Sequence, residues 1–556
     1  MLEKINQKSR LIVAILFILM TLIGLLVTPN YGMPWDELME IRTLGSSVRE
    51  YVGLFQGEEN EPTKSTTGIE LTDVRDNPDI DHGQSVYYPL SPFLFTELGR
   101  GEARTLMLIF HAYTFLIFMA GVVFLYFIAK FLTGNWKYGV LASLFMYLSP
   151  RFFAEGHYNS KDIMTMSLLI ICFWFMIKFI ETKKYRYATL FAFVCAIAAN
   201  MRIVGLFFFG LAGLLYLFYL TVTKQWNRKT FLAGVIAVFA FVLFYFLLTP
   251  AAWESPVKFI QYVFKRSSNY EDWPGYVYFQ GSAYRPVPWN YIPIMIAVTT
   301  PILILLLTII GNFTTIGQIF RTKVKDLFSG NLKYYLLSFV FVWVFLGFAM
   351  IKQPILYDSW RHFYFLYGFF LILAIGGLTC IMNKLKGKVR WAVAGLVALQ
   401  LLACATSMVL NHPYQYVYFN FLAGAHPGEN YEMDYWNVSQ MNCLMKLIDE
   451  NDSEKTIYVY AAEWCSHDGL VKAYNILPAE YKREMVVLDI SYTGIPSKAD
   501  YLMVSLRAMQ ISVFSTNLGS SDWIYSNGLG KYTTTYPIAV SCEAYGSDFM
   551  TIYKLP

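Results

Sequence analysis

Acidic residues stand at the ends of apolar stretches, where ionisable side chains often have a chemical role. Asp36-Glu37 follows the first apolar stretch, and Lys161-Asp162 directly precedes a later one. A carboxylate in such a place can act as a general base towards an incoming hydroxyl group. Each acid also has a plainer explanation, because acidic residues at a helix start stabilise the helix dipole.

The segment 149–162 is unusually rich in ionisable groups for a short turn. They are Arg151, Glu155, His157, Lys161 and Asp162. Ser160 is a candidate N-cap, which would make Asp162 an ordinary first-turn acid. A purely structural turn seldom needs five such groups, so we interpret the segment as part of a site.

Two arginines lie at the ends of further apolar stretches. Arg202 lies between two of them, and Arg361-His362 open another. A guanidinium group can hold a phosphate bidentately, although each arginine taken singly can equally be an interface anchor or an ion-pair partner. Together with the carboxylates, they predict a site for an anionic, lipid-linked substrate.

The elements that position these residues are predicted to be membrane-spanning helices. Hydrophobic residues make up 56% of the 556 residues and charged residues only 15%, which excludes an ordinary soluble enzyme. A span needs about 20 apolar residues. We expect about eleven spans, of which 138–149 and 186–200 are short, near residues 11–28, 105–131, 138–149, 163–180, 186–200, 203–222, 230–249, 291–311, 334–351, 362–383 and 390–410.

The charges of the loops predict their sidedness. Loops rich in Lys and Arg alternate with longer loops that carry the acids. By the positive-inside rule the basic loops are cytoplasmic, so the N-terminus is inside a plasma (inner) membrane and the loops 29–104 and 150–162 face outward. The chain is therefore predicted to be an all-α polytopic membrane protein with its transmembrane domain at 1–410.

Residues 411–556 are predicted to form a small extracytoplasmic α/β domain. Acids outnumber basic residues there, and short apolar runs at 456–460, 485–490 and 501–505 indicate strands, with a helix near 467–475.

The first outer loop, 29–104, begins with an amphipathic stretch. After Pro34, apolar residues recur at spacings of three and four as far as Phe55, which predicts a helix on the membrane surface. Further along, the spacing of the acids is not that of an EF-hand and favours a solvated acidic loop over a cation site. These residues are Asp73, Asp76, Asp79, Asp81 and His82. We predict no metal and no cofactor, and the small net charge of +5 argues against a nucleic-acid partner.

The motifs resemble those of the GT-C superfamily of integral-membrane glycosyltransferases, in the protein O-mannosyltransferase and aminoarabinose-transferase branch. Asp36-Glu37 is similar to that family's acidic pair on the first outer loop, and the segment from His157 to Asp162 is similar to its second acidic motif. The other similar motifs are Tyr87-Tyr88-Pro-Leu90, which lacks the family's histidine, Arg202, where relatives often have lysine, and Arg361-His362-Phe-Tyr.

The resemblance implies a polyprenyl-phosphate-sugar donor, membrane lipids around the protein, and a lipid, glycan or protein acceptor on the outer face. It implies inverting transfer with Asp36 as general base, while Glu37 and Asp162 position the acceptor or the cations. The implied substrate-binding residues are His157, Lys161, Arg202, Arg361, His362 and Tyr88.

Two other classes of protein remain. A secondary transporter or lipid-linked sugar flippase would also be polytopic, but it would usually show paired halves and charges near mid-membrane. A scaffold protein would not explain why acids and cations share one side.

Overall fold

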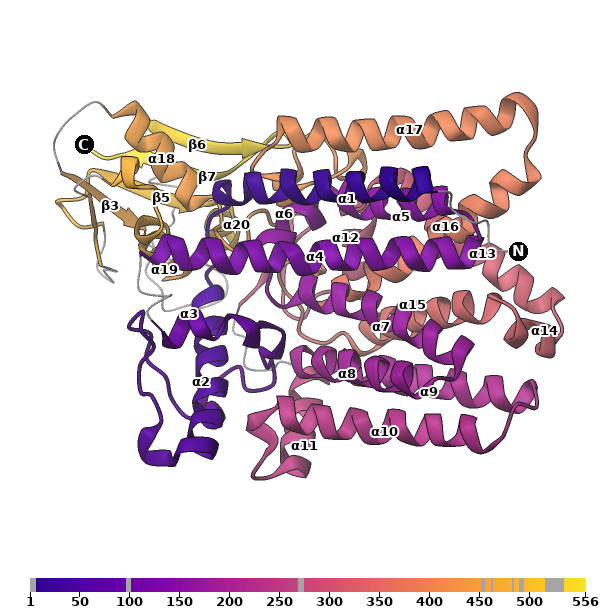
Figure 1. Ribbon diagram of the computed structural model, residues 1–556. Helices are drawn as coiled ribbons and strands as arrows, with labels where there is room; N and C mark the ends of the chain where they lie inside the picture. Colours follow the sequence, from indigo (N-terminus) through magenta and orange to yellow (C-terminus); the bar gives the residue numbers. More distant parts are fainter. Residues whose placement is uncertain are drawn as a thin grey trace.

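The structure is a computed structural model that describes residues 7–96, 102–268, 275–451, 456–461, 464–482, 485–489, 495–515 and 535–556. Long helices lie side by side in a bundle, and a small sheet lies at one end of it (Figure 1). The first helix, α1 (Gln7–Val27), begins at the opposite end. We call the two ends of the bundle the sheet end and the far end.

Nine helices in the described part of the chain are long and apolar enough to cross a membrane. Their large apolar side chains are often exposed, as with Phe239, which is 68% exposed, and Leu402, which is 64% exposed. Faces of this kind suit lipid rather than water, which confirms the all-α polytopic membrane fold. The long helices after α1 are α4 (Ala103–Thr133), α7 (Asp162–Thr182), α9 (Val204–Val222), α10 (Arg228–Leu248), α13 (Ile302–Arg321), α15 (Leu332–Lys352), α16 (Tyr367–Lys384) and α17 (Gly387–Leu410).

The remaining predicted spans are shorter or interrupted. α5 (Trp136–Tyr147) and α8 (Tyr185–Met201) are shorter than the nine long helices. The predicted span 291–311 is broken, because α12 (Tyr291–Thr299) ends just before Pro301 and α13 follows it. Proline has no backbone N–H to donate and disfavours a helical conformation in the residue before it. The number of spans, eleven, stays a prediction.

Shorter elements connect the long helices. α2 (Glu37–Gln56) runs across the direction of the long helices, the orientation expected of a helix on a membrane surface (Figure 1). The others are α3 (Pro92–Phe95), α6 (Pro150–Tyr158), α11 (Pro256–Ser268), α14 (Val324–Ser329), the 3₁₀ segments η4 (Ser85–Leu90) and η7 (Arg361–Leu366), and the hairpin strands β1 (Val277–Phe279) and β2 (Ser282–Tyr284).

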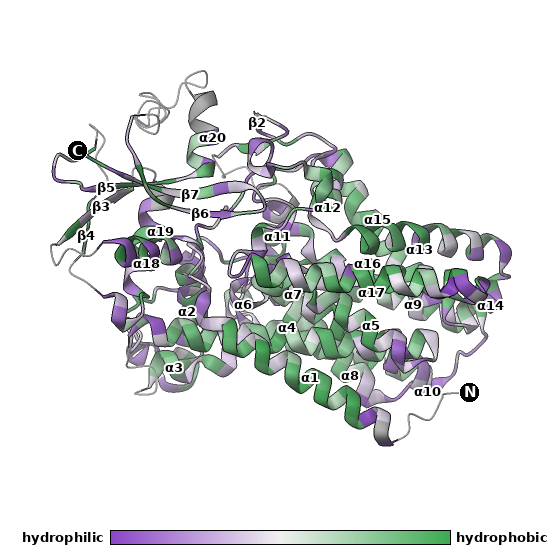
Figure 2. Ribbon diagram, turned by 90° about the horizontal axis from the view of Figure 1, so that it is seen from above, coloured by the Kyte–Doolittle hydropathy of each residue, from purple (hydrophilic) through white to green (hydrophobic). Residues whose placement is uncertain are grey.

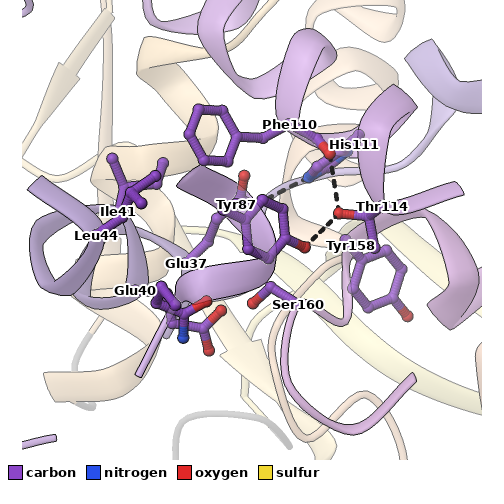
Figure 3. Close-up of a pocket in the computed structure, with 11 residues that line it drawn as sticks. Glu37, Glu40, Ile41, Leu44, Tyr87, Phe110, His111, Thr114, Tyr158 and Ser160 are labelled. Atoms are coloured by element: carbon purple, nitrogen blue, oxygen red, sulfur yellow. Dashed lines mark hydrogen bonds and ion pairs between the residues drawn. The ribbon is translucent and has the colours of Figure 1, made fainter. Parts of the chain in front are cut away.

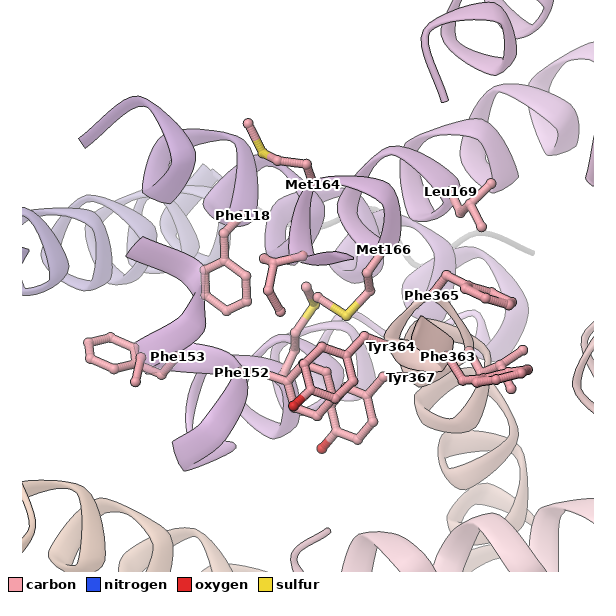
Figure 4. Close-up of a cluster of buried hydrophobic side chains, with 14 of the residues drawn as sticks. Phe118, Phe152, Phe153, Met164, Met166, Leu169, Phe363, Tyr364, Phe365 and Tyr367 are labelled. Atoms are coloured by element: carbon pink, nitrogen blue, oxygen red, sulfur yellow. The ribbon is translucent and has the colours of Figure 1, made fainter. Parts of the chain in front are cut away.

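A hydrophobic core of aromatic, methionine and leucine side chains joins α4, α6, α7, η7 and α16 (Figure 4). Phe152 of α6 stacks on Tyr367 of α16, with ring centroids 3.8 Å apart, and both side chains are buried. Stacked and edge-to-face rings of this kind stabilise a core beyond their buried area. The core fixes the start of α7 and of η7, where Asp162 and Arg361 stand.

The sheet has five strands in the order β4-β3-β5-β7-β6. The strands β4, β3 and β5 are parallel to one another, and β7 runs antiparallel to both of its neighbours, β5 and β6. The strands β3 (Ile457–Ala461), β4 (Met485–Val487) and β5 (Tyr501–Ser505) confirm the three predicted runs, and α19 (Trp464–Asn475) confirms the helix between the first two. Residue 490 of the second run lies outside the described residues. The elements that were not predicted are β6 (Ile538–Ala544), β7 (Ser547–Lys554), α18 (Gln440–Glu450) and α20 (Leu506–Ser515).

Hydropathy differs between the two parts of the molecule (Figure 2). Apolar residues dominate the bundle, whereas the sheet and the helices beside it mix polar and apolar residues. The chain leaves the bundle where α17 ends, at Leu410. A division into domains at residue 410 stays a prediction.

Candidate active site

Charged side chains from separate segments meet at the sheet end of the bundle. The turn before α7 supplies two of them, and its geometry depends on Asn159, whose Oδ1 accepts a hydrogen bond from the backbone N–H of Asp162 at 2.8 Å. The predicted cap, Ser160, is therefore wrong. An asparagine side chain satisfies an otherwise unpaired N–H group at a helix start in the same way.

Asp162 joins the two arginines that were predicted to bind phosphate. Its Oδ1 lies 2.6 Å from Nη2 of Arg202, and its Oδ2 lies 3.4 Å from Nη1 of Arg361. The Asp162 side chain is only 1% exposed, so water does not screen these ion pairs. One carboxylate thus fixes the distance between two guanidinium groups.

Asp36 lies on the open side of this cluster. Its Oδ2 is 4.0 Å from Nη2 of Arg361, and 35% of its side chain is exposed. It immediately precedes α2, yet its side chain makes no capping hydrogen bond within the described residues. The carboxylate is therefore accessible while it stays within reach of a buried cation.

Lys161 forms ion pairs with two parts of the first outer loop, α2 and the later segment that contains Asp79. Its Nζ lies 3.2 Å from Oε1 of Glu40 and 3.1 Å from Oδ2 of Asp79. Burial raises the pKa of Glu40 to about 8, although the charge of Lys161 opposes the shift. Burial also opposes the charged form of Lys161, but the carboxylates of Asp79, Glu40 and Asp36 raise the pKa of this amine overall.

The prediction that the acidic residues of the first outer loop are solvated is wrong for Asp79 and Asp81. Asp81 is buried, and its Oδ1 lies 3.2 Å from Nε of Arg266, while its Oδ2 lies 3.2 Å from Nδ1 of His82. Asp79 lies between Lys161 and Arg266. The reason is that α11 brings Arg266 from a distant part of the sequence against this loop.

Glu37 lines a pocket between α2, η4, α4 and α6, which Glu40 also lines (Figure 3). Oε2 of Glu37 lies 2.9 Å from Nε2 of His111. Several buried polar atoms around the pocket have no hydrogen-bond partner among the described residues. They are Glu37 Oε1, Glu40 Oε2, His111 Nδ1, Tyr158 OH and both amide atoms of Gln84. A pocket with this lining and with room for little more than one water molecule suits a water or a single hydroxyl group.

Of three further predicted substrate-binding residues, His157 and Tyr88 pack against other segments, whereas His362 lies beside the charged cluster. His157 is stacked between the rings of Tyr31 and Phe115, and its nitrogens lie within hydrogen-bond distance of backbone carbonyls, so it belongs to the core. Tyr88 donates to the carbonyl of Leu248 and packs between α2 and α10. His362 adjoins Arg361, and its buried Nδ1 has no hydrogen-bond partner in the described part of the chain.

Comparison with known proteins finds a family model that matches part of the bundle. Residues 94–249 match the family model described as dolichyl-phosphate-mannose-protein mannosyltransferase. This segment is thus similar in sequence to a mannosyltransferase family. The resemblance to GT-C glycosyltransferases is thereby confirmed for a segment that contains Lys161, Asp162 and Arg202.

The fold is similar to that of two solved structures of ArnT from Cupriavidus metallidurans. Each match covers 97% of this chain and 97% of the ArnT chain. One structure is bound to undecaprenyl phosphate, with a TM-score of 0.42 and 11% identity, and the other is in the apo state, with a TM-score of 0.44 and 13% identity. No curated protein sequence matches the chain.

Several members of the charged cluster were not predicted. Glu40 of α2 stands four residues after Asp36, which precedes that helix, and Asp358 stands three residues before Arg361. Helical spacing and proximity could have indicated both. Arg266 and Arg507 had no such signal, because they are distant in sequence from their partners Asp81 and Asp358.

Proposed function

We propose that this protein transfers a sugar from a polyprenyl-phosphate donor to an acceptor hydroxyl group on the outer face of the plasma membrane. The observation that carries the proposal is the place of Asp36, a partly exposed carboxylate 4.0 Å from the buried guanidinium group of Arg361. This arrangement brings a base and a phosphate-binding cation together at one open site.

Asp36 acts as the general base in this mechanism. The acceptor oxygen attacks the anomeric carbon while its proton passes to a carboxylate oxygen of Asp36. The bond from the anomeric carbon to the phosphate oxygen breaks, and its electron pair leaves on the polyprenyl phosphate. A single displacement inverts the anomeric carbon, and phosphate leaves without the help of a general acid.

Arg361 and Arg202 hold the departing phosphate. A guanidinium group has five N–H donors, so pairing with Asp162 leaves donors for the phosphate oxygens. Asp162 then orients the two cations, which favours this role over positioning the acceptor. His362 and Lys161 lie next to these groups and add hydrogen-bond donors.

Glu37 contributes through the pocket that it shares with His111. The unpartnered oxygen and nitrogen atoms there suit one hydroxyl group of a hexosyl or pentosyl unit, because the pocket has room for little more than one water molecule. Lipid, glycan and protein hydroxyl groups are all chemically competent acceptors in this mechanism. We also propose that the N-terminus lies in the cytoplasm and that residues 411–556 lie outside.

Transfer can be measured with purified protein in lipid nanodiscs. A panel of radiolabelled polyprenyl-phosphate hexoses and pentoses is incubated with envelope lipids, glycans and proteins, and the product's anomeric configuration is determined. We expect one donor to give an inverted product. Movement of labelled donor across vesicle membranes without any product would instead support the flippase or transporter class.

A further inference from the structure

The C-terminal region reaches into the charged cluster through Arg507, the second residue of α20. Nη1 of Arg507 lies 2.9 Å from Oδ1 of Asp358, whose Oδ2 lies 2.9 Å from Nη2 of Arg361. The Arg507 side chain is 11% exposed and that of Asp358 is 1% exposed. One buried carboxylate therefore joins a cation of the C-terminal region to a cation of the proposed phosphate site.

The same region also holds the segment that carries the proposed base. Lys472 of α19 donates a hydrogen bond from Nζ to the backbone oxygen of Trp35 at 2.5 Å, and Trp35 directly precedes Asp36. The guanidinium carbon of Arg507 lies 6.0 Å from the centre of the Trp35 ring, a cation–π distance. Two cations of the C-terminal region thus contact the residue before Asp36.

The backbone around Asp358 has an uncommon conformation. Asp358 and Ser359 have φ angles of 58° and 63°, which non-glycine residues seldom adopt. The next residue, Trp360, is buried and donates from Nε1 to Oγ1 of Thr299 at 2.8 Å. Strained conformations persist only where the surroundings hold them, and they concentrate at functional sites.

We propose that Arg507 is a positioning residue for the donor phosphate, which makes the C-terminal region part of the active site. This inference rests on the proposed function. Arg507 shares the charge of Asp358 and thereby leaves N–H donors of Arg361 for the phosphate. Without Arg507, the buried carboxylate of Asp358 must be neutralised by Arg361. This stronger pairing draws the guanidinium group of Arg361 away from the donor phosphate. Glu432, whose Oε1 lies 3.7 Å from Nε of Arg507, helps to hold Arg507 in place.

A double-mutant cycle tests this relationship in the full-length protein. The probe is a polyprenyl monophosphate in detergent, and its Kd is measured for wild type, R507A, R507K, D358N and R507A/D358N, with the melting temperature of each. Asparagine tolerates positive φ, so D358N removes the charge and keeps the turn. The control is K498A, which removes an exposed cation of the same region.

We expect R507A to weaken binding roughly 10-fold, and R507K to weaken it less because the charge remains. In the D358N background, loss of Arg507 should change Kd by less than about twofold, since a neutral amide needs no counter-ion. Unchanged affinity in R507A, or an equal loss in both backgrounds, would overturn the inference while the proposed function stands. If wild type does not bind the polyprenyl phosphate, both fail.

Discussion

Arg361 and Asp162 are 199 positions apart in the sequence, and Nη1 of Arg361 lies 3.4 Å from Oδ2 of Asp162. The pair joins the start of η7 to the start of α7, and both side chains are almost completely buried. Removing one partner of such a pair leaves an uncompensated buried charge, which commonly costs about 3–5 kcal/mol. Activity and stability must therefore be measured together for every variant of this cluster.

Replacing Asp36 by Asn should abolish transfer and leave the fold intact. Loss of a general base lowers the rate by about 10²–10⁴-fold. The side chain is partly exposed and outside the apolar core, so the melting temperature should stay close to that of wild type. The matched control is D76N, the same change at an exposed acid of the first loop. Turnover by D36N within about threefold of wild type would remove Asp36 from the role of base.

Replacing Arg361 or Arg202 by Ala should weaken donor binding. A charge-assisted hydrogen bond contributes about 1.5–3 kcal/mol, so a loss of roughly 10- to 150-fold in donor affinity is expected. Lysine should rescue poorly, because it cannot reproduce a bidentate contact.

The control for both arginines is R186A, an exposed arginine of α8 beyond the site. Because Asp162 loses a partner in either variant, some fall in melting temperature accompanies the effect. A lower melting temperature with unchanged donor Kd would show that the arginines only stabilise the fold.

The stability of the protein should depend on pH through Glu40. Burial raises the pKa of Glu40 from its ordinary value of 4.5 to about 8. Between these values the folded protein keeps a proton that the unfolded chain releases, so the stabilising contribution of this group is lost as pH rises towards 8.

In the variant E40Q the side chain at position 40 stays neutral at every pH. The stability of this variant therefore lacks the pH-dependent loss that Glu40 causes. The melting temperature of wild type minus that of E40Q should therefore fall between about pH 5 and pH 8 and level off above it. Parallel melting profiles for the two proteins would show that Glu40 has the same affinity for protons folded and unfolded.

Cysteine labelling tests the proposed orientation. Glu59 and Ser329 are exposed and belong to segments at the sheet end and the far end of the bundle. In a background without the seven native cysteines, E59C should react with an impermeant thiol reagent on intact cells, whereas S329C should react only after permeabilisation. The opposite pattern would invert the topology.

The sequence by itself determined the class of fold and indicated that the charges gather at one end of the bundle. Runs of about 20 apolar residues predict spans because each run must cross the hydrocarbon layer by itself. The strands β3 and β5 were predictable for a similar reason, since their residues are buried as a continuous run. Asp36, Asp162 and Arg361 stood out because charged residues beside apolar runs need an explanation.

The tertiary structure alone decided which charges meet. Nothing in the local sequence distinguishes Asp79 and Asp81, which are paired in the cluster, from Asp76, which is exposed on the same loop. His157 is predicted to bind substrate, yet its ring is stacked between those of Tyr31 and Phe115, which come from other parts of the chain. Periodicity reports the burial of a segment's faces, whereas an ion pair such as that of Arg507 and Asp358 depends on how segments far apart in the chain pack together.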